Sequence, residues 1–390
     1  MALWDELTGQ AEAIAVFEAA ASASSAGGSD DSSMTHSWHI TGPPGSGRSN
    51  LAFAFAAALL SSTPEGDPVV QRQVAARTHP DLAVLSTDRV IISIEEVRQL
   101  VATSQYSPSV GRFRVVIIED ADRMTERTSN VLLKALEEPP PRTVWILCAP
   151  SEADLIPTIR SRVRTVQLRV PAIADVAELI HRRDGVDLEL ATRAAREAQS
   201  HIGMAHRLAT NAEARERRAR TLELALGIRS VSGAVAAAGT LLQLATDDAK
   251  AITEERDAEE RENTLRSLGI EPGGTIPPAL RVQLKNLEED QKRRATRSLR
   301  DGIDRILVDL LSLYRDVLLI QLGAVSKQAS SELINLSIER QLMTASAEAT
   351  APQTLATMDA IATARKRIAG NVAPALALEA MLVGAVRTAA

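Results

Sequence analysis

The stretch that decides the fold is HSWHITGPPGSGRSNLAFAFAAALL, residues 36–60. A short apolar strand runs into a turn rich in glycine and proline, and an alanine-rich helix follows. Within the turn, residues 42–49 read GPPGSGRS, one residue away from the phosphate-binding pattern G-x-x-x-x-G-K-[ST] between a strand and a helix. The sequence therefore predicts a phosphate-binding loop (P-loop) origin, in preference to a Gly-rich turn that binds nothing.

Five residues of this loop are the candidates for holding a phosphate group. Gly42, Gly45 and Gly47 let the backbone bend so that successive N–H groups point inward, and the helix N-terminus adds its dipole. Ser49 stands where a hydroxyl would hold magnesium. Arg48 replaces the lysine, and its wide planar guanidinium is not equivalent to a compact ammonium at a crowded phosphate site. A working nucleotide site and a degenerate one are about equally consistent with this loop.

A second acidic motif follows the apolar run at 114–118, which we expect to be a buried strand. Residues 119–122 read EDAD, where a P-loop ATPase places an Asp for magnesium and, in many families, a Glu that activates water. The order is reversed here: Glu119 is one methylene too long for the metal position, and Asp120 is one too short for the base position. A displacement of that size can cost about 10²-fold in rate. The alternative interpretation is a pair of capping acids at a strand end.

The composition bounds the class of protein. The 390 residues suggest two or three domains, and the net charge of −6 argues against a surface that grips nucleic acid throughout. Cys148 is the single cysteine, which excludes an intrachain disulfide and a multi-cysteine zinc cage. Residues 1–10 lack the basic and apolar runs of a signal peptide, and no stretch reaches the roughly 18 uninterrupted apolar residues of a membrane helix. We therefore expect a soluble, cytoplasmic chain without a membrane partner.

Strands and helices alternate in the first part of the chain. Besides the strand and helix around the loop, strands are expected at 82–85, 114–118 and 144–148, and helices at 10–22, 94–103 and 125–138. This alternation predicts a parallel sheet with helices on both faces. Residues 23–35 are predicted to form a loop, and the polar segment 61–77 shows no clear pattern of either a helix or a strand.

After about residue 165 the strand signal ends, and nearly everything reads as helix. Residues 172–209 resemble a small helical module, and a long helix over 279–322 carries an apolar stripe with one polar gap at Gln291. An acidic run at 247–262 precedes a Pro/Gly breaker at 269–278. We expect the charged stretch 247–300 to be peripheral, because mixed charge on a helix is usually a solvated face.

These motifs together resemble the bacterial DNA polymerase III clamp-loader family. The resemblance rests on GPPGSGRS, EDADRM (119–124), SNVLLKALEEPPPRT (129–143) and IPTIRSR (156–162), and THPDL (78–82) and SIEEVRQL (93–100) fit the same family. Within it, the pattern is most similar to subunits of the delta-prime type. LTGQ (7–10) resembles the adenine-pocket segment, and residues 298–324 resemble the collar helix of such subunits in high-GC bacteria.

The resemblance implies an α/β AAA+ P-loop module at 1–168, a helical lid at 169–212 and an all-α collar at 213–390. Five related subunits, including delta and tau/gamma, then form a ring that opens the sliding clamp and holds primer–template DNA. Such a heteropentamer belongs to a polymerase holoenzyme, a nucleotidyltransferase at the level of the assembly, in a nucleoid-associated cytoplasmic replisome. Delta-prime subunits do not themselves hydrolyse ATP.

The family's Ser-Arg-Cys motif appears as Ser161-Arg162-Val163. The resemblance implies that Arg162 reaches the ATP of a neighbouring subunit, where a cation supplied in trans can be worth about 10³–10⁵ in rate. Arginine suits this role because its fork pairs two oxygens at once. Without the family match, the ordinary interpretation of Arg162 is a surface arginine in a loop.

Further departures argue against hydrolysis by this chain. Ala149-Pro150 stands where a sensor Thr or Asn would touch the terminal phosphate, and neither side chain donates a hydrogen bond. His206, followed by Arg207, stands where an active lid presents a sensor arginine. We expect ATP or ADP to be held without hydrolysis, if at all. Residues 61–77 lack the cysteines of the zinc module found in relatives, so we expect no zinc.

Two alternative functions remain from the sequence. The first is an active clamp-loader ATPase, similar to tau/gamma, that uses Arg48 in place of the lysine. The second is a P-loop protein of another assembly, such as a branch-migration motor. The long helical C-terminal half without a DNA-reading helix-turn-helix disfavours the second.

Overall fold

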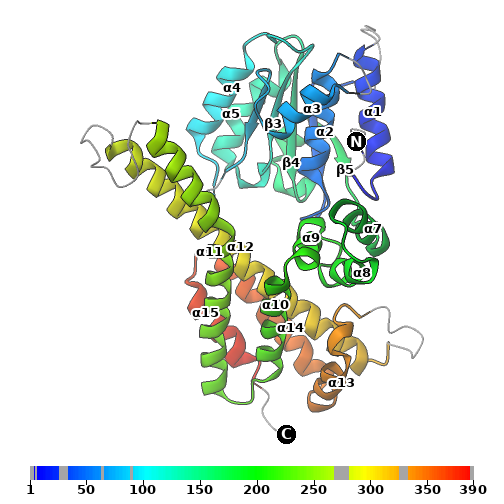
Figure 1. Cartoon of the computed structure of the whole chain (residues 1–390), viewed down its shortest axis with the longest axis vertical. Coiled ribbons are helices and arrows are strands. Elements are labelled where there is room, and N and C mark those ends of the chain that lie inside the picture. Colours follow the sequence, from blue (N-terminus) through cyan, green and yellow to red (C-terminus); the bar gives the residue numbers. More distant parts are fainter. Residues whose placement is uncertain are drawn as a thin grey trace. The chain divides into compact units, whose positions relative to one another are not determined.

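The computed structural model describes residue 4 and residues 7–25, 34–62, 66–87, 91–267, 281–324 and 333–386. The chain divides into two compact units, Met1–Thr210 and Asn211–Ala390, whose elements are labelled in Figure 1. In the part of the chain so described, no helix is long and apolar enough to span a bilayer.

A five-stranded parallel sheet forms the centre of the first unit. Its strand order is β2-β3-β4-β1-β5, and every neighbouring pair is parallel. The strands are β1 (Ser37–Thr41), β2 (Leu82–Leu85), β3 (Arg114–Ile118), β4 (Thr143–Ala149) and β5 (Arg164–Gln167). The predicted bounds of β2 and β3 are confirmed residue for residue. The fifth strand was not expected from the sequence, and it pairs with β1 along one edge.

Helices cover both faces of this sheet, as Figure 1 shows. One face carries α1 (Ala11–Ser25), α2 (Arg48–Leu60) and α3 (Pro68–Ala75), and the other carries α4 (Ile94–Ser104), α5 (Glu126–Glu137) and the short α6 (Pro157–Arg160). Because side chains alternate along a strand, β3 directs Val115 and Ile117 to the first core and Val116 and Ile118 to the second. The predicted fold class is confirmed.

Two segments of this unit differ from the sequence prediction. Helix α1 runs to Ser25, so residues 23–25 of the expected loop are helical, and residues 26–33 lie outside the described residues. Helix α3 lies in the segment that gave no clear signal, because Val74 is its one buried side chain and the apolar stripe is too thin to detect. Asp67 caps α3 by accepting a hydrogen bond from the backbone N–H of Val69.

Three short helices complete the first unit: α7 (Ile173–Asp184), α8 (Leu188–Glu197) and α9 (Ile202–Thr210). They are the helices expected in residues 172–209. Each buries apolar side chains, among them Ile180, Ala195 and Leu208. Gly185 ends α7 in a left-handed conformation, as is common for glycine after a helix.

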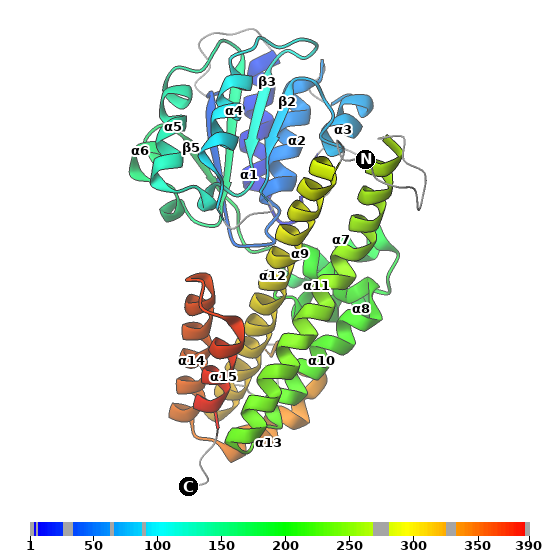
Figure 2. The same cartoon turned by 90° about the vertical axis from the view of Figure 1, so that its left-hand side faces the viewer.

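The described part of the second unit is helical. Its helices are α10 (Ala212–Leu226), α11 (Val231–Ser267), α12 (Arg281–Gln321), α13 (Glu339–Glu348), α14 (Ala351–Ala369) and α15 (Pro374–Gly384). Helix α12 packs against α14, and α11 packs against α15 (Figure 2). Leu310, Leu313 and Val317 of the predicted stripe are buried in the hydrophobic core of this unit.

Described polar residues in the charged halves of α11 and α12 contact one another. The Gln291 side chain donates to the carbonyl of Asp257 (2.9 Å), and Arg294 pairs with the Asp257 carboxylate (2.7 Å). Arg294 is 8% exposed, so the expectation of a purely solvated face is wrong here. The polar gap in the stripe is therefore a specific contact between the helices. The breaker at 269–278 lies outside the described residues.

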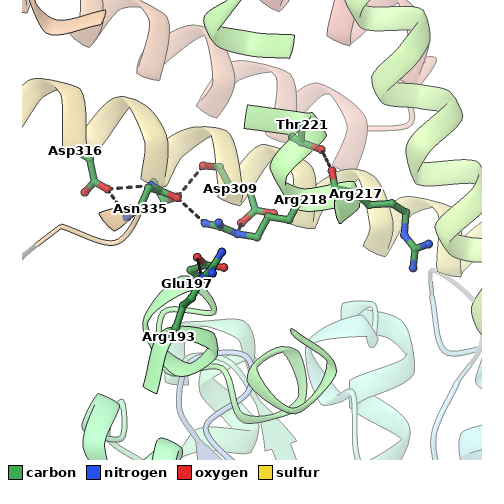
Figure 3. Close-up of polar contacts among 9 residues, drawn as sticks. Arg193, Glu197, Arg217, Arg218, Thr221, Asp309, Asp316 and Asn335 are labelled. Carbon is green, nitrogen blue, oxygen red and sulfur yellow. Dashed lines mark hydrogen bonds and ion pairs between the residues drawn. The ribbon is translucent and has the colours of Figure 1, made fainter. Parts of the chain in front are cut away.

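A buried polar network fixes α10 to α12 (Figure 3). Arg218 donates to Asp309 (2.9 Å) and to the side-chain oxygen of Asn335 (2.6 Å). The backbone N–H of Asn335 donates to Asp316 (2.8 Å), whose side chain is fully buried. Buried polar groups of this kind are tolerated when each has a partner.

Candidate nucleotide site and the Arg162 surface

The loop between β1 and α2 needs glycine at two positions. Gly47, the residue just before α2, has φ 92°, and Gly45 has φ 80°, both in the left-handed region that favours glycine. A Cβ on Gly45 would lie 2.2 Å from the ring of His201, and the backbone N–H of Ile202 donates to the Gly45 carbonyl (3.3 Å). The loop is therefore held against the start of α9.

Pro150 also holds the loop in place. Its carbonyl accepts from the backbone N–H of Gly42 (3.2 Å) and from the Thr41 hydroxyl (3.2 Å). The residues Ala149-Pro150, which lack a phosphate-sensing side chain, thus support the loop through the backbone. This contact could not be predicted, because it joins segments that lie far apart in the sequence.

Arg48 folds back onto its own loop. Its guanidinium donates a hydrogen bond to the carbonyl of Gly42. Burial lowers the pKa of Arg48, while the nearby charges of Asp122 and Asp120 act in the opposite direction. Because an arginine pKa starts far above neutrality, the side chain stays a cation. A positive charge is therefore fixed where the family pattern has lysine.

A cavity of about 530 Å³ opens beside this loop and α2. The loop and α2 contribute the predicted Gly45, Gly47, Arg48 and Ser49 to its lining, together with Asn50. Gly42, the remaining predicted loop residue, does not line the cavity; it is the carbonyl partner of Arg48. Four of the five candidate loop residues thus line the same cavity.

The helices after the sheet supply the opposite wall. His206 of α9, the predicted sensor position, lines the cavity, and so does Arg183 of α7. Asp184 accepts hydrogen bonds from Arg183 (2.9 and 3.1 Å) and from His206 (2.7 Å). These contacts, with the Arg183 bond foremost, lower the pKa of Asp184. Arg183 was missed from the sequence, where HRRDG at a helix end was the only available signal.

The two acids after β3 do not line this cavity. Glu119 forms an ion pair with Arg77 (2.7 Å), and Asp120 pairs with Arg123 of the same turn (3.7 Å). Asp120 begins a 3-10 turn, Ala121–Arg123, without a side-chain capping bond, so the capping interpretation does not hold for it. Among the described residues, no cluster of three or more His, Cys, Asp or Glu side chains could hold a metal ion.

Cys148 lies beneath the site on β4 and is fully buried. Burial raises the pKa of its thiol to about 12. The thiol is therefore protonated and unreactive at neutral pH. This agrees with the interpretation of Cys148 as a small buried hydrophobe.

Arg162 lies on the surface just after α6, and it is not among the residues that line the cavity. Its Nε donates to the Glu137 carboxylate at the end of α5 (2.6 Å), and its Nη1 donates to the Thr158 carbonyl (2.7 Å) and the Ser161 hydroxyl (3.1 Å). The side chain keeps 33% exposure. Glu137 and Ser161 thus hold an exposed guanidinium in a defined direction. Glu137 was not singled out from the sequence.

Arg164, two residues further on, has a different environment. Its guanidinium stacks over the Trp38 ring, 5.1 Å from the centroid. A cation over an aromatic face is a stabilising contact. This contact within the fold separates Arg164 from Arg162.

Comparisons with known proteins match the first unit. Residues 23–172 match the model of the family described as DNA polymerase III, delta subunit. The delta' subunit of Pseudomonas aeruginosa is 34% identical over 154 residues, which are 38% of this chain and 47% of that protein. Residues 23–172 are therefore similar to clamp-loader subunits of DNA polymerase III. The family resemblance predicted from the motifs is thereby confirmed.

Clamp-loader subunits of a second type also match. The tau/gamma subunit of Haemophilus influenzae is 30% identical over 149 residues, covering 37% of this chain and 22% of that protein. The chain therefore spans less than half the length of these curated relatives. A DNA polymerase III gamma subunit-related protein from Thermotoga maritima superposes with a TM-score of 0.37 at 20% identity, covering 66% of this chain and 94% of that one.

Proposed function

We propose that this clamp-loader chain is a delta-prime subunit that hydrolyses no ATP and supplies Arg162 to ATP bound on a neighbouring subunit. In this role it joins delta and tau/gamma subunits in a ring that loads the sliding clamp onto primer–template DNA during replication. The helices of residues 211–390 serve as the collar that holds the ring together.

The observation that carries this proposal is the position of Arg162. The guanidinium is exposed, and Glu137, Thr158 and Ser161 fix its direction without enclosing it. A fixed, partly exposed guanidinium suits a phosphate of another molecule, because its charge faces solvent and a phosphate oxygen can replace one of its partners within the chain. A positioned arginine also loses less freedom on contact than a mobile one.

The chain's own loop supports the non-hydrolysing part of the proposal. Arg48 is engaged with Gly42, and Glu119 is engaged with Arg77. The position after β4 offers only the Ala149 methyl and the Pro150 carbonyl, which is already bonded to the loop. The residues in place of the P-loop lysine and the magnesium-binding acid are thus bonded to other groups of this chain. Those in place of the phosphate-sensing residue have no side chain that can donate a hydrogen bond.

The test uses rings rebuilt from this chain and the other clamp-loader subunits. Arg162→Ala should leave ring assembly intact and reduce total ATPase only in part, because the other sites keep their own arginines, while clamp loading falls with it. At the affected site the loss should approach the roughly 10³-fold expected for a missing trans arginine. Arg162→Lys should rescue poorly, since a point charge lacks the fork.

Arg98→Ala is the matched control, because Arg98 is also an exposed arginine paired with a carboxylate, Glu95 (2.7 Å). It should leave both activities unchanged. Normal ATPase and clamp loading in assembled Arg162→Ala rings would make Arg162 an ordinary surface arginine.

The second candidate function is an active ATPase of the tau/gamma type, which the tau/gamma relatives among the matches favour. The isolated chain separates the two. We expect no ATP turnover above background, and DNA-stimulated turnover that Ser49→Ala abolishes would establish the second function instead.

A further inference from the structure

The guanidinium of Arg162 is held from two sides by different kinds of group. On one side Nε donates to the Glu137 carboxylate (2.6 Å), and Nη2 contacts the same oxygen. On the other side Nη1 donates to the Thr158 carbonyl (2.7 Å) and to the Ser161 hydroxyl (3.1 Å). A guanidinium has five N–H groups, and one on Nε, one on Nη2 and two on Nη1 are engaged with these described residues. To pair two phosphate oxygens at once, Arg162 must therefore exchange a partner within its own chain.

The Nη1 side is the one that exchanges more readily. A hydrogen bond between a cation and a carboxylate is stronger than one to a neutral acceptor. Glu137 offers a carboxylate, whereas Thr158 and Ser161 offer neutral oxygens. Glu137 therefore keeps its hold on the guanidinium while Nη1 turns to a phosphate oxygen. The group that this exchange separates from Arg162 is the Thr158 carbonyl.

Ser161 is bonded to both of the groups that separate. Its hydroxyl donates to the Thr158 carbonyl (3.1 Å) and accepts from Arg162 Nη1, so the three groups form a closed triangle. A hydroxyl can donate and accept at the same time. After Nη1 leaves, the Ser161 hydroxyl still donates to the carbonyl. The carbonyl is then not left unpaired against a neighbouring subunit, where a buried acceptor without a donor would be unfavourable.

We propose that Ser161 is a positioning residue that eases the transfer of Arg162 from its own chain to a phosphate of ATP on the neighbouring subunit. The inference rests on the proposed function of Arg162 and adds a role for the residue before it. Without the hydroxyl, the Thr158 carbonyl loses its second donor, so Arg162 is held more firmly to its own chain. In this role Ser161 touches neither the nucleotide nor the reacting atoms and acts through Arg162.

The experiment measures ATP hydrolysis in single-turnover assays of rings rebuilt with wild-type or variant chain. Ser161→Ala should lower kcat at the affected site about fivefold, the size expected for one neutral hydrogen bond. KM should change little, because the trans arginine acts on the charge of the transition state. Ser161→Thr keeps a hydroxyl and should stay within about twofold of the wild type. On an Arg162→Ala background, Ser161→Ala should cause no further loss.

Ser86→Ala is the matched control. Ser86 is also an exposed serine whose hydroxyl accepts from an arginine Nη1, that of Arg77 (3.0 Å). The substitution removes the same kind of bond away from Arg162 and should leave kcat unchanged. Thermal unfolding of the isolated chain supplies a second readout. Ser161→Ala should unfold at the same temperature as the wild type, whereas the loss of a serine needed only to cap α6 would lower it.

The outcomes separate this inference from the proposed function. Unchanged kcat in Ser161→Ala rings, with the Arg162→Ala effect intact, would remove the role of Ser161 alone. A further loss from Ser161→Ala on the Arg162→Ala background, or a fall in its unfolding temperature that Ser86→Ala does not share, would give Ser161 a role independent of the arginine and overturn the inference. Normal hydrolysis in assembled Arg162→Ala rings would overturn the proposed function and this inference together.

Discussion

Asp81 and Arg162 are both centres of hydrogen-bond clusters, but the two clusters serve different ends. Asp81 is fully buried and accepts from the backbone N–H groups of Ser109, Val110 and Gly111, which tie down the loop before β3. Arg162 keeps a third of its side chain exposed while its partners fix it. A charge whose partners enclose it stabilises the fold, and one whose partners leave it open can act on another molecule.

The first prediction concerns removal of the buried carboxylate of Asp81. Burial alone would raise the pKa of Asp81, but the three backbone N–H groups outweigh it and lower the pKa to about 2. Asp81→Asn turns an amide NH₂ toward these donors and leaves Arg114, 3.2 Å away, without its carboxylate. Urea unfolding should show a loss of about 3 kcal/mol, as for other broken buried pairs.

The exposed Glu95 provides the control for this substitution. Glu95→Gln should change the unfolding free energy by no more than about 0.5 kcal/mol, because surface ion pairs contribute little. A loss at Asp81 no larger than at Glu95 would remove the distinction between enclosed and open clusters.

The second prediction concerns His39, a buried base on β1. Burial, against a smaller opposing effect of Asp154, lowers its pKa to about 4. The unfolded chain takes up the proton near pH 6.5 and the folded chain does not, so stability is lost as pH falls from 6.5 towards 4. Between pH 7.5 and 5.0 the wild type should lose about 2 kcal/mol more than His39→Gln in urea unfolding.

His36, which is exposed near the start of the same strand, is the control. His36→Gln should keep the full wild-type loss at low pH. If His39→Gln and the wild type lost stability equally over this range, His39 would already be solvated and freely protonated in the folded state.

The third prediction concerns Glu137, which belongs to the exposed cluster around Arg162. Glu137 does not contact the neighbouring ATP in the proposed ring, but it orients Arg162 (2.6 Å). Glu137→Gln should slow hydrolysis at the affected site about tenfold, or about 1.4 kcal/mol, through kcat with KM little changed. Rebuilt rings with Glu137→Gln, Arg162→Ala and both changes form a double-mutant cycle.

Two outcomes of this cycle decide the role of Glu137. A double variant no slower than Arg162→Ala alone would confirm that Glu137 acts through Arg162. Additive losses would mean that Glu137 has a role of its own.

The smallest expected effect is on folding at Arg162 itself. Arg162→Ala should change the unfolding free energy of this chain by no more than about 0.5 kcal/mol, as is usual for surface positions away from cores and caps. Thermal unfolding of the isolated chain measures this. A loss comparable with that of Asp81→Asn would place Arg162 among the structural charges.

Several features of the molecule could be predicted from the sequence because they depend on local pattern. The strands Leu82–Leu85 and Arg114–Ile118 are short apolar runs between polar segments, and the loop glycines at 45 and 47 mark backbone that only glycine adopts easily. Strand β5 was missed because it lies at a sheet edge, where only Val166 of its four residues is buried. One apolar side chain is too few to show the alternation of apolar and polar residues that predicts a strand.

The sequence by itself determined the parallel α/β fold, the loop between β1 and α2, and the set of residues that depart from an ATPase. Only the tertiary structure decided which charges are engaged: Arg77 with Glu119, His206 with Asp184 and Glu137 with Arg162. The physical reason is that an ion pair depends on distance in space. Local residue pattern sets where strands and helices form, whereas their packing sets which distant side chains meet.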